Sequence, residues 1–383
     1  MFSRRHVALR IAVYALAFRV VSAIAAFLAN VAFPPYQSQP ITIFGRPSTF
    51  WDPFARYDSG WFFGIARNGY EYVANGRSNF AYFPVYPLLM RHVGRLFGPG
   101  ASNVYLAGIL VSWTAFVLSM IVLYYLARLD LPARRAERAV LLTAVFPFAF
   151  FFGVVYTESV FLLFTVASFY AFRTRRWVPG GLAGGVATAT RVNGVLMVPA
   201  LGWMAWRNAG PEGRDRVLAL AGVVLAASGI ALYSLYVYSR SGNPLEWAAS
   251  IQRWGYYPGG SPLLAPFRIL RALILHPYAF LAGERMALYD TLNGLTALAF
   301  AASVPFVWKR FGAAYGIFLL VNLWLPLSSG QYEGLGRYCS VLFPSFIWLA
   351  SLRSRALVTG LIVVFAMFYS LCLALFTTIH PLF

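Results

Sequence analysis

Asp58 is the carboxylate of this sequence with the clearest potential for chemistry, because it lies in an aromatic-rich and otherwise apolar segment, Arg56-Tyr57-Asp58-Ser59-Gly60-Trp61. A carboxylate held in apolar surroundings loses hydration and therefore needs a partner or a function. Beside an acceptor hydroxyl, it could take the hydroxyl proton as a general base. A structural alternative stays open, in which Asp58 caps a helix or forms a salt bridge with Arg56 or Arg67.

Two polar turns interrupt apolar runs further along the chain, Tyr156-Thr157-Glu158-Ser159 and Thr190-Arg191-Val192-Asn193-Gly194. Charged side chains at the ends of apolar hairpins are costly unless they are paired, exposed or functional. Glu158 and Arg191 could simply pair with each other, or they could belong to the same site as Asp58.

The elements that must position these residues are membrane-spanning helices. Of 383 residues, 60% are hydrophobic and 11% are charged, whereas soluble domains are about 45–50% apolar and about 25% charged. Uncharged runs such as 102–127 and 217–239 are long enough, as helices, to cross a hydrocarbon core of about 30 Å. The runs are continuous rather than alternating, which excludes a membrane β-barrel. We predict an all-α, polytopic integral membrane protein that forms one domain, 1–383.

We expect about eleven transmembrane helices, some of them short enough to be tilted or kinked. Their predicted ranges are 8–29, 102–127, 139–154, 157–172, 178–190, 194–206, 217–238, 287–308, 311–327, 339–352 and 356–378.

The basic residues predict the orientation. More than half of the Lys and Arg lie in short segments at 1–10, 128–138, 173–176, 207–216, 309–310 and 353–355. By the positive-inside rule these segments, and with them the N-terminus, are cytoplasmic. The long loops 30–101, 239–286 and 328–338 are then outside, so acid chemistry is expected on the extracytoplasmic face of the plasma (inner) membrane. The net charge of +19 does not predict nucleic-acid binding, because the arginines lie in short loops between apolar runs rather than on one face of a soluble domain.

The first outer loop is crowded with aromatic residues from 50 to 86. Residues 54–68 and 87–97 are predicted to form amphipathic helices at the membrane interface, where Trp and Tyr are favoured. These helices could simply rest among the headgroups. The second long loop, 239–286, includes Arg253 and is either an interfacial cover or a lid over a substrate groove.

The residues around Asp58 resemble the first lumenal loop of GPI mannosyltransferase II, the PIG-V family. That family has Trp-Asp followed by an aromatic-rich helix ending in Ile-Ala-x-x-Gly-Tyr, and here Asp58 is followed by Ile65-Ala66-Arg67-Asn68-Gly69-Tyr70. Tyr57 replaces the usual Trp. The stretch Phe80-Ala81-Tyr82-Phe83-Pro84 is similar to the family's next motif.

The two polar turns also resemble this family in motif and in order. The first is similar to Tyr-Ser/Thr-Glu-Ala/Ser-x-Phe and the second to x-x-Arg-Ser/Pro-Asn/Thr-Gly, so the resemblance extends from Arg56 to Gly194. Gly336-Arg337-Tyr338, followed by Phe343-Pro344, resembles the bacterial members. Almost all of the basic residues are arginine rather than lysine, and the chain is short. We therefore expect a prokaryotic member of the family.

The resemblance implies a membrane glycosyltransferase of the GT-C class. Such an enzyme would transfer a hexose, mannose by analogy, from a polyprenyl-phosphate donor to an acceptor hydroxyl, with inversion. Asp58 would be the base, and an arginine would hold the phosphate leaving group, since its planar fork can bind two oxygens. The arginine candidates are Arg191 and Arg337, with Arg253 behind them, and Glu158 would orient the acceptor or hold Arg191. The predicted substrate-binding residues are Arg56, Trp61, Tyr82, Glu158, Arg191, Asn193, Arg253, Arg337 and Tyr338.

This scheme requires no cofactor and no metal. The four histidines are scattered, and two cysteines form neither a disulfide framework nor a CxxC motif. A divalent metal between Asp58 and Glu158 is conceivable but not expected.

Two other classes of function stay open. One is a lipid or sugar transporter or flippase, although no repeated halves are evident. The other is an assembly subunit of a larger synthase, in which Asp58 would be a buried salt-bridge partner. The acceptor is also open, between a glycolipid, a glycan and a protein, and a monomer is expected.

Overall fold

The computed structural model describes residues 4–38, 41–255, 261, 264–284 and 288–380, and the described part of the chain is all-helical, without strands. Among the described residues, five helices are long and apolar enough to cross a membrane. They are α1 (Arg4–Ala32), α4 (Ala101–Ala127), α9 (Gly213–Ser241), α13 (Leu288–Phe311) and α17 (Arg355–Thr377).

The remaining predicted spans correspond to shorter helices, so the count of eleven crossings is not confirmed. These helices are α5 (Ala133–Ala144), α6 (Glu158–Arg173), α7 (Trp177–Thr188), α8 (Val198–Asn208), α14 (Ala313–Ser328) and α16 (Phe343–Ser351).

The predicted span 139–154 is wrong as one continuous helix. Helix α5 ends at Ala144, and a separate 3-10 turn, η3 (Ala149–Gly153), leads into α6. Pro147 lies between them, and proline lacks the N–H that a continuing helix needs. The break buries the 149–156 segment in the core beside the Glu158 turn.

Close helix packing by small residues holds α7 against α9. A Cβ placed on Gly229 would lie 1.9 Å from the carbonyl oxygen of Gly185, and one on Gly181 would lie 2.4 Å from that of Gly222. Glycine therefore permits the approach of the two backbones, as small residues do in membrane helix pairs. This packing fixes α7, whose C-terminal end leads directly into the turn that carries Arg191.

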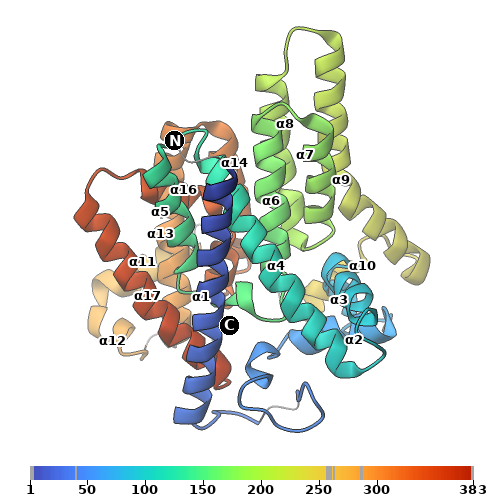
Figure 1. The fold of residues 1–383 in the computed structure, drawn as a ribbon, viewed down its shortest axis with the longest axis vertical. Helices are drawn as coiled ribbons and strands as arrows, with labels where there is room; N and C mark the ends of the chain where they lie inside the picture. The colour runs from blue at the N-terminus through green and yellow to red at the C-terminus, as the bar shows by residue number, and fades with distance from the viewer. Residues whose placement is uncertain (1–3, 39–40, 256–260, 262–263, 285–287, 381–383) are drawn as a thin grey trace.

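In Figure 1, α6, α7, α8 and α9 form one group. Its upper end extends beyond the other helices, at the end of the molecule where α1 begins. Toward the other end, three short helices gather: α2 (Ser59–Asn68), α3 (Val85–Arg95) and α10 (Glu246–Arg253) (Figure 1). The remaining described helices are α11 (Leu264–Leu275), α12 (Pro277–Leu281) and α15 (Leu335–Ser340), with 3-10 turns η1 (Asp52–Phe54), η2 (Asn79–Ala81) and η4 (Val192–Met197).

The predicted amphipathic helix 54–68 is shorter than expected, because Tyr57 breaks it. Tyr57 has a φ of 49°, in the left-handed region, and the helix begins only at Ser59. A helix of L-residues cannot pass through this backbone conformation. The turn leaves Asp58 at the N-cap of α2 with no capping hydrogen bond from its side chain. The second predicted helix, 87–97, corresponds to α3.

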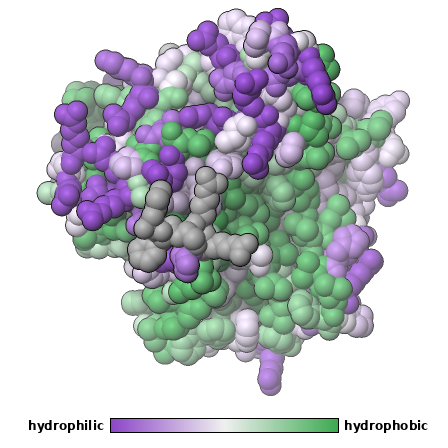
Figure 2. All heavy atoms as spheres, turned by 45° about the horizontal axis from the view of Figure 1, so that its top comes forward, coloured by the Kyte–Doolittle hydropathy of each residue, from purple (hydrophilic) through white to green (hydrophobic). Residues whose placement is uncertain are grey.

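The exterior is largely apolar. Figure 2 shows hydrophilic side chains gathered toward one end of the molecule, above a surface that is mostly hydrophobic. Large aliphatic side chains are exposed on the long helices, for example Leu9 (65%), Leu232 (65%) and Met367 (68%). An exposed apolar surface of this extent is expected of a protein whose solvent is the bilayer.

Candidate active site

A cavity of about 530 Å³ lies beside the start of α2. Six aromatic side chains contribute to its lining, namely Tyr57, Trp61, Phe62, Tyr82, Phe83 and Trp254. Polar and charged groups also contribute, among them Thr157, Thr190, Arg191, Glu333 and Arg337. Asp58 and Tyr338 also line the cavity. A largely apolar cavity with a few convergent polar groups is the usual form of a small-molecule site.

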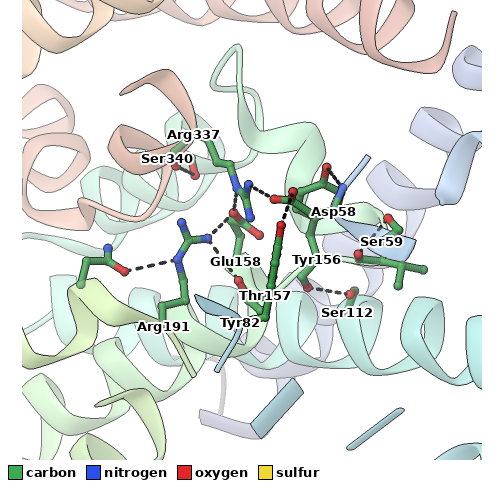
Figure 3. A network of polar contacts seen from close by, with 12 residues as sticks. Asp58, Ser59, Tyr82, Ser112, Tyr156, Thr157, Glu158, Arg191, Arg337 and Ser340 are labelled. Atoms are coloured by element: carbon green, nitrogen blue, oxygen red, sulfur yellow. Dashed lines mark hydrogen bonds and ion pairs between the residues drawn. The ribbon is translucent and has the colours of Figure 1, made fainter. Parts of the chain in front are cut away.

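Four charged side chains form one network at this cavity (Figure 3). The Nη1 of Arg337 donates to Asp58 Oδ2 at 2.6 Å, and the Nε of the same guanidinium donates to Glu158 Oε1. Arg191 Nη1 donates to the same Glu158 oxygen. The three sequence motifs and the Arg337 segment therefore meet, although more than 270 residues separate the first from the last.

Burial differs sharply across the network. The side chain of Glu158 is 0% exposed and that of Arg191 is 9% exposed, whereas Arg337 is 14% and Asp58 is 27% exposed. Two guanidiniums offset two carboxylates, which makes burial of these charges tolerable. Glu158 serves as the shared anion that holds both arginines in place. Asp58 is the charged group of the four that is most open to the cavity.

Neighbouring hydrogen bonds fix the position of Asp58. The hydroxyl of Tyr82 donates to Asp58 Oδ1 at 3.2 Å, and the backbone N–H of Asp58 donates to the hydroxyl of Tyr156 at 3.3 Å. Ser59 Oγ donates to the carbonyl of Val155 at 3.1 Å. The start of α2 is thus attached to the buried turn that precedes Glu158, which sets the distance between the two carboxylates.

Polar neighbours also orient Arg191. Its Nη1 donates to Thr157 Oγ1 at 3.2 Å and its Nε donates to Asn193 Oδ1 at 3.3 Å. The guanidinium lies 5.4 Å from the ring centroid of Tyr338. Asn193 is 1% exposed and does not line the cavity. It supports Arg191 and has no direct access to a substrate in this conformation.

Arg56 is not among the residues that line the cavity. It is 5% exposed, and its Nε donates to the carbonyl of Thr377 at 3.3 Å. Burial lowers the pKa of Arg56 to about 10, which still leaves it cationic at neutral pH. Its position indicates that it anchors the loop to the end of α17.

Arg253 also lies outside the lining of the cavity. It forms a salt bridge with Glu246 on the same helix and donates from Nη1 to the carbonyl of Gly76 at 3.3 Å. The neighbouring Trp254 does line the cavity, as does Ile251. Sequence reasoning chose Arg253 for its charge and passed over Trp254. The helical spacing of Ile251 and Trp254 would have indicated a common face.

No group of three or more His, Cys, Asp and Glu side chains gathers as a metal site within the described ranges. Asp58 and Glu158 are instead bridged by Arg337. A cation already occupies the space between the two carboxylates, where a metal would compete with it.

The fold is similar to solved membrane glycosyltransferases of the GT-C class. ArnT from Cupriavidus metallidurans, bound to undecaprenyl phosphate, matches with a TM-score of 0.52 and 16% identity over 96% of this chain and 76% of that chain. The apo oligosaccharyltransferase of Archaeoglobus fulgidus matches with a TM-score of 0.50 and 14% identity, over 96% of this chain and 56% of that one.

The S. cerevisiae O-mannosyltransferase complex Pmt1-Pmt2 matches over 63% of this chain, with a TM-score of 0.44 and 14% identity, and the match spans 34% of the yeast chain. The comparison with curated proteins found no match. At these identities the structural likenesses show the fold alone.

The family is shown by a sequence model. The model for mannosyltransferases of the PIG-V type matches residues 3–207, which is more than half of the chain and includes Asp58, Glu158 and Arg191. Together with the helices that can cross a bilayer, this match identifies an integral membrane glycosyltransferase. The chain belongs to the mannosyltransferase (PIG-V) family.

Proposed function

We propose that this protein transfers a hexose, mannose by its family, from a polyprenyl-phosphate-linked donor to an acceptor hydroxyl, with inversion at the sugar carbon. The observation that carries the proposal is the position of Asp58, which lines the cavity between a phenol and a guanidinium. A base and a cationic leaving-group site are the two groups that this reaction needs.

In the reaction, the acceptor oxygen forms a bond to the anomeric carbon while the bond from that carbon to the phosphate oxygen breaks. The acceptor proton passes to Asp58, and the electron pair of the broken bond stays on polyprenyl phosphate. Arg337 and Arg191 stabilise the charge that develops there, since a guanidinium can donate to two phosphate oxygens. Glu158 holds the two arginines in place.

Two features support a polyprenyl-phosphate donor. The fold is shared with ArnT, whose structure holds undecaprenyl phosphate. Both cavity arginines bind the same Glu158 oxygen, so their guanidiniums lie close enough together to act on one phosphate. No cofactor takes part in the proposed reaction, and neither does a metal, because Arg337 and Arg191 supply the positive charge.

We place the site on the extracytoplasmic face of the plasma (inner) membrane, with a cytoplasmic N-terminus, on the strength of the Lys and Arg distribution. The acceptor belongs to the glycolipids, glycans or proteins of that face, and the protein acts as a monomer. The transporter alternative is less well supported, because the cluster of charges gathers at one cavity, as an enzyme site requires.

The proposal is tested with purified protein in lipid nanodiscs, radiolabelled polyprenyl-phosphate mannose and a membrane extract of the host. We expect saturable donor binding and label in a new product. Donor binding without any labelled product, in the presence of the complete host extract, would contradict the transferase activity. Absence of donor binding would contradict the donor class.

A further inference from the structure

A second cavity, of about 420 Å³, is a groove between α1 and α5. Helix α4 packs against both of these helices, whereas α1 and α5 hardly contact each other within the described ranges. Most of the lining is apolar, for example Phe18 of α1, Met120 of α4 and Leu141 of α5. Met120 is fully buried, while Leu141 and Tyr14 are exposed. The groove therefore has α4 as its floor and opens to the surroundings of the protein.

One end of the groove is charged. Arg10 of α1 and Glu137 of α5 form a salt bridge there, and their side chains are 43% and 40% exposed. Both residues belong to the first turns of their helices, so this is the end of the molecule at which α1 begins. An ion pair as exposed as this one is held weakly. The guanidinium of Arg10 is therefore accessible to a second anion.

The groove continues from the charged end along both helices. Past the end of α5, the Nη1 of Arg19 donates to the carbonyl of Ala149 at 3.3 Å. Together with the Arg10 salt bridge, this contact shows that α1 and α5 run in the same direction. The lining on α5 extends from Glu137 to Ala144, which corresponds to about 10 Å of helix. A charged end and an apolar channel of this length match a headgroup and the first part of an acyl chain.

Two further arginines add positive charge to this end of α5. Arg134 and Arg138 lie on either side of Glu137 in the sequence, and neither forms a salt bridge with the residues that the structure describes. Arg134 is exposed and precedes Glu137 by three residues, which places both on one face of the helix. Three arginines, with Arg10, thus stand against one carboxylate. The charged end favours an anionic ligand.

We infer that the groove binds one phospholipid with an anionic headgroup. Its phosphate lies at Arg10 and Arg134, and an acyl chain follows the groove past Leu141 toward Phe18. A guanidinium can donate to two phosphate oxygens, and basic residues at the ends of membrane helices attract anionic lipids. A soluble anion would use the charged end but would leave the apolar channel unexplained. The groove shares no lining residue with the cavity of Asp58, so the inference does not depend on the proposed reaction.

The test counts bound lipids by native mass spectrometry of the full-length protein, titrated in detergent with phosphatidylglycerol or with phosphatidylcholine of the same acyl chains. The wild type should retain one phosphatidylglycerol with about tenfold higher affinity, since each nearby arginine adds to the attraction of an anionic lipid. Arg134→Gln should lose most of this preference. Arg207→Gln is the matched control, because Arg207 is also an exposed arginine near a helix end, but on α8. It should bind as the wild type does.

A second pair of variants tests the apolar channel. Leu141→Trp puts a larger side chain into the groove and should weaken the binding of both lipids. Leu220→Trp makes the same change at an exposed leucine of α9 and should have no effect. The thermal unfolding temperature of each variant, measured without added phospholipid, shows that it is folded.

Equal affinities of the wild type for the two lipids would overturn the inference. An equal loss in Arg134→Gln and Arg207→Gln would also overturn it, because the lipid would then respond to net charge alone. Full retention of phosphatidylglycerol by Leu141→Trp would show that the lipid binds outside the groove. Displacement of phosphatidylglycerol by polyprenyl phosphate at an equal or lower concentration would assign the groove to a polyprenyl lipid and would contradict a phospholipid site.

Discussion

The Nη1 of Arg337 lies 2.6 Å from Asp58 Oδ2, while the Nε of the same guanidinium donates to the fully buried Glu158. The proposed phosphate ligand, Arg337, therefore holds the proposed base, Asp58, in this structure. A phosphate that binds Arg337 competes with Asp58 and Glu158 for the positive charge of the same guanidinium. Donor binding would draw Arg337 toward the phosphate and leave Asp58 free to accept a proton.

This competition predicts an ordered reaction in which the donor binds first. A non-reactive acceptor analogue should bind only after the donor, and should therefore inhibit uncompetitively with respect to the donor in initial-rate kinetics. Competitive inhibition by the analogue would mean that it binds the free enzyme, and the proposed release of Asp58 by the donor would be wrong.

Replacement of Arg337 should weaken the binding of the donor more than the binding of the acceptor. Arg337→Ala should weaken the binding of polyprenyl phosphate by about tenfold or more, because charge-assisted contacts of a guanidinium contribute about 1.5–3 kcal/mol. Arg337→Lys keeps the charge but loses the planar fork, so its affinity for polyprenyl phosphate should lie between those of the wild type and Arg337→Ala. Equal donor affinity of wild type and Arg337→Ala would remove Arg337 from the phosphate site.

Glu158 should be needed for stability as well as for activity. Glu158→Gln leaves Arg191 and Arg337 without their shared anion in a buried place, and loss of one partner of a buried ion pair costs about 3–5 kcal/mol. We expect a clear drop in the thermal unfolding temperature in detergent. Glu71→Gln, at an exposed acid between α2 and α3, is the matched control and should leave that temperature unchanged. Equal unfolding temperatures would show that the network is not structural.

The packing of α7 on α9 predicts opposite outcomes for two glycine substitutions. Gly229→Ala puts a methyl group 1.9 Å from the Gly185 carbonyl oxygen, whereas the same change at Gly202 in α8 meets nothing within 4 Å. Gly229→Ala should lower the unfolding temperature and the activity, since it displaces the hairpin that carries Arg191. Gly202→Ala should leave both unchanged or slightly improve stability. Equal behaviour of the two variants would contradict the close approach of the helices.

Much of the fold class could be predicted from the sequence, because long apolar runs have few structural solutions in a bilayer. Helix ends were harder to predict. Hydropathy runs through Pro147 without a change, yet the helix stops before it. Likewise Tyr57 gives no sequence signal of a positive φ, and the predicted helix 54–68 begins only at Ser59.

The candidate site was predictable to the extent that its residues lie in local motifs. Asp58, Glu158, Arg191 and Arg337 each stand in such a motif, and the structure brings them together (Figure 3). Arg56 and Arg253 were also predicted to bind substrate, but their partners are the carbonyl oxygen of Thr377 and the carboxylate of Glu246. Trp254 was missed because its importance depends on Trp61 and Tyr82, and no local pattern connects these residues.

The central claim is that Asp58 accepts the proton of the acceptor hydroxyl. Its most direct test is the rate of mannosyl transfer by Asp58→Asn in nanodiscs, at saturating donor and with host acceptor, beside Glu71→Gln as control. The isosteric amide keeps the size of the side chain, and loss of a general base lowers the rate by about 10²–10⁴-fold. We expect such a loss with donor binding and unfolding temperature preserved. Transfer by Asp58→Asn at the rate of the wild type would show that Asp58 is not the general base.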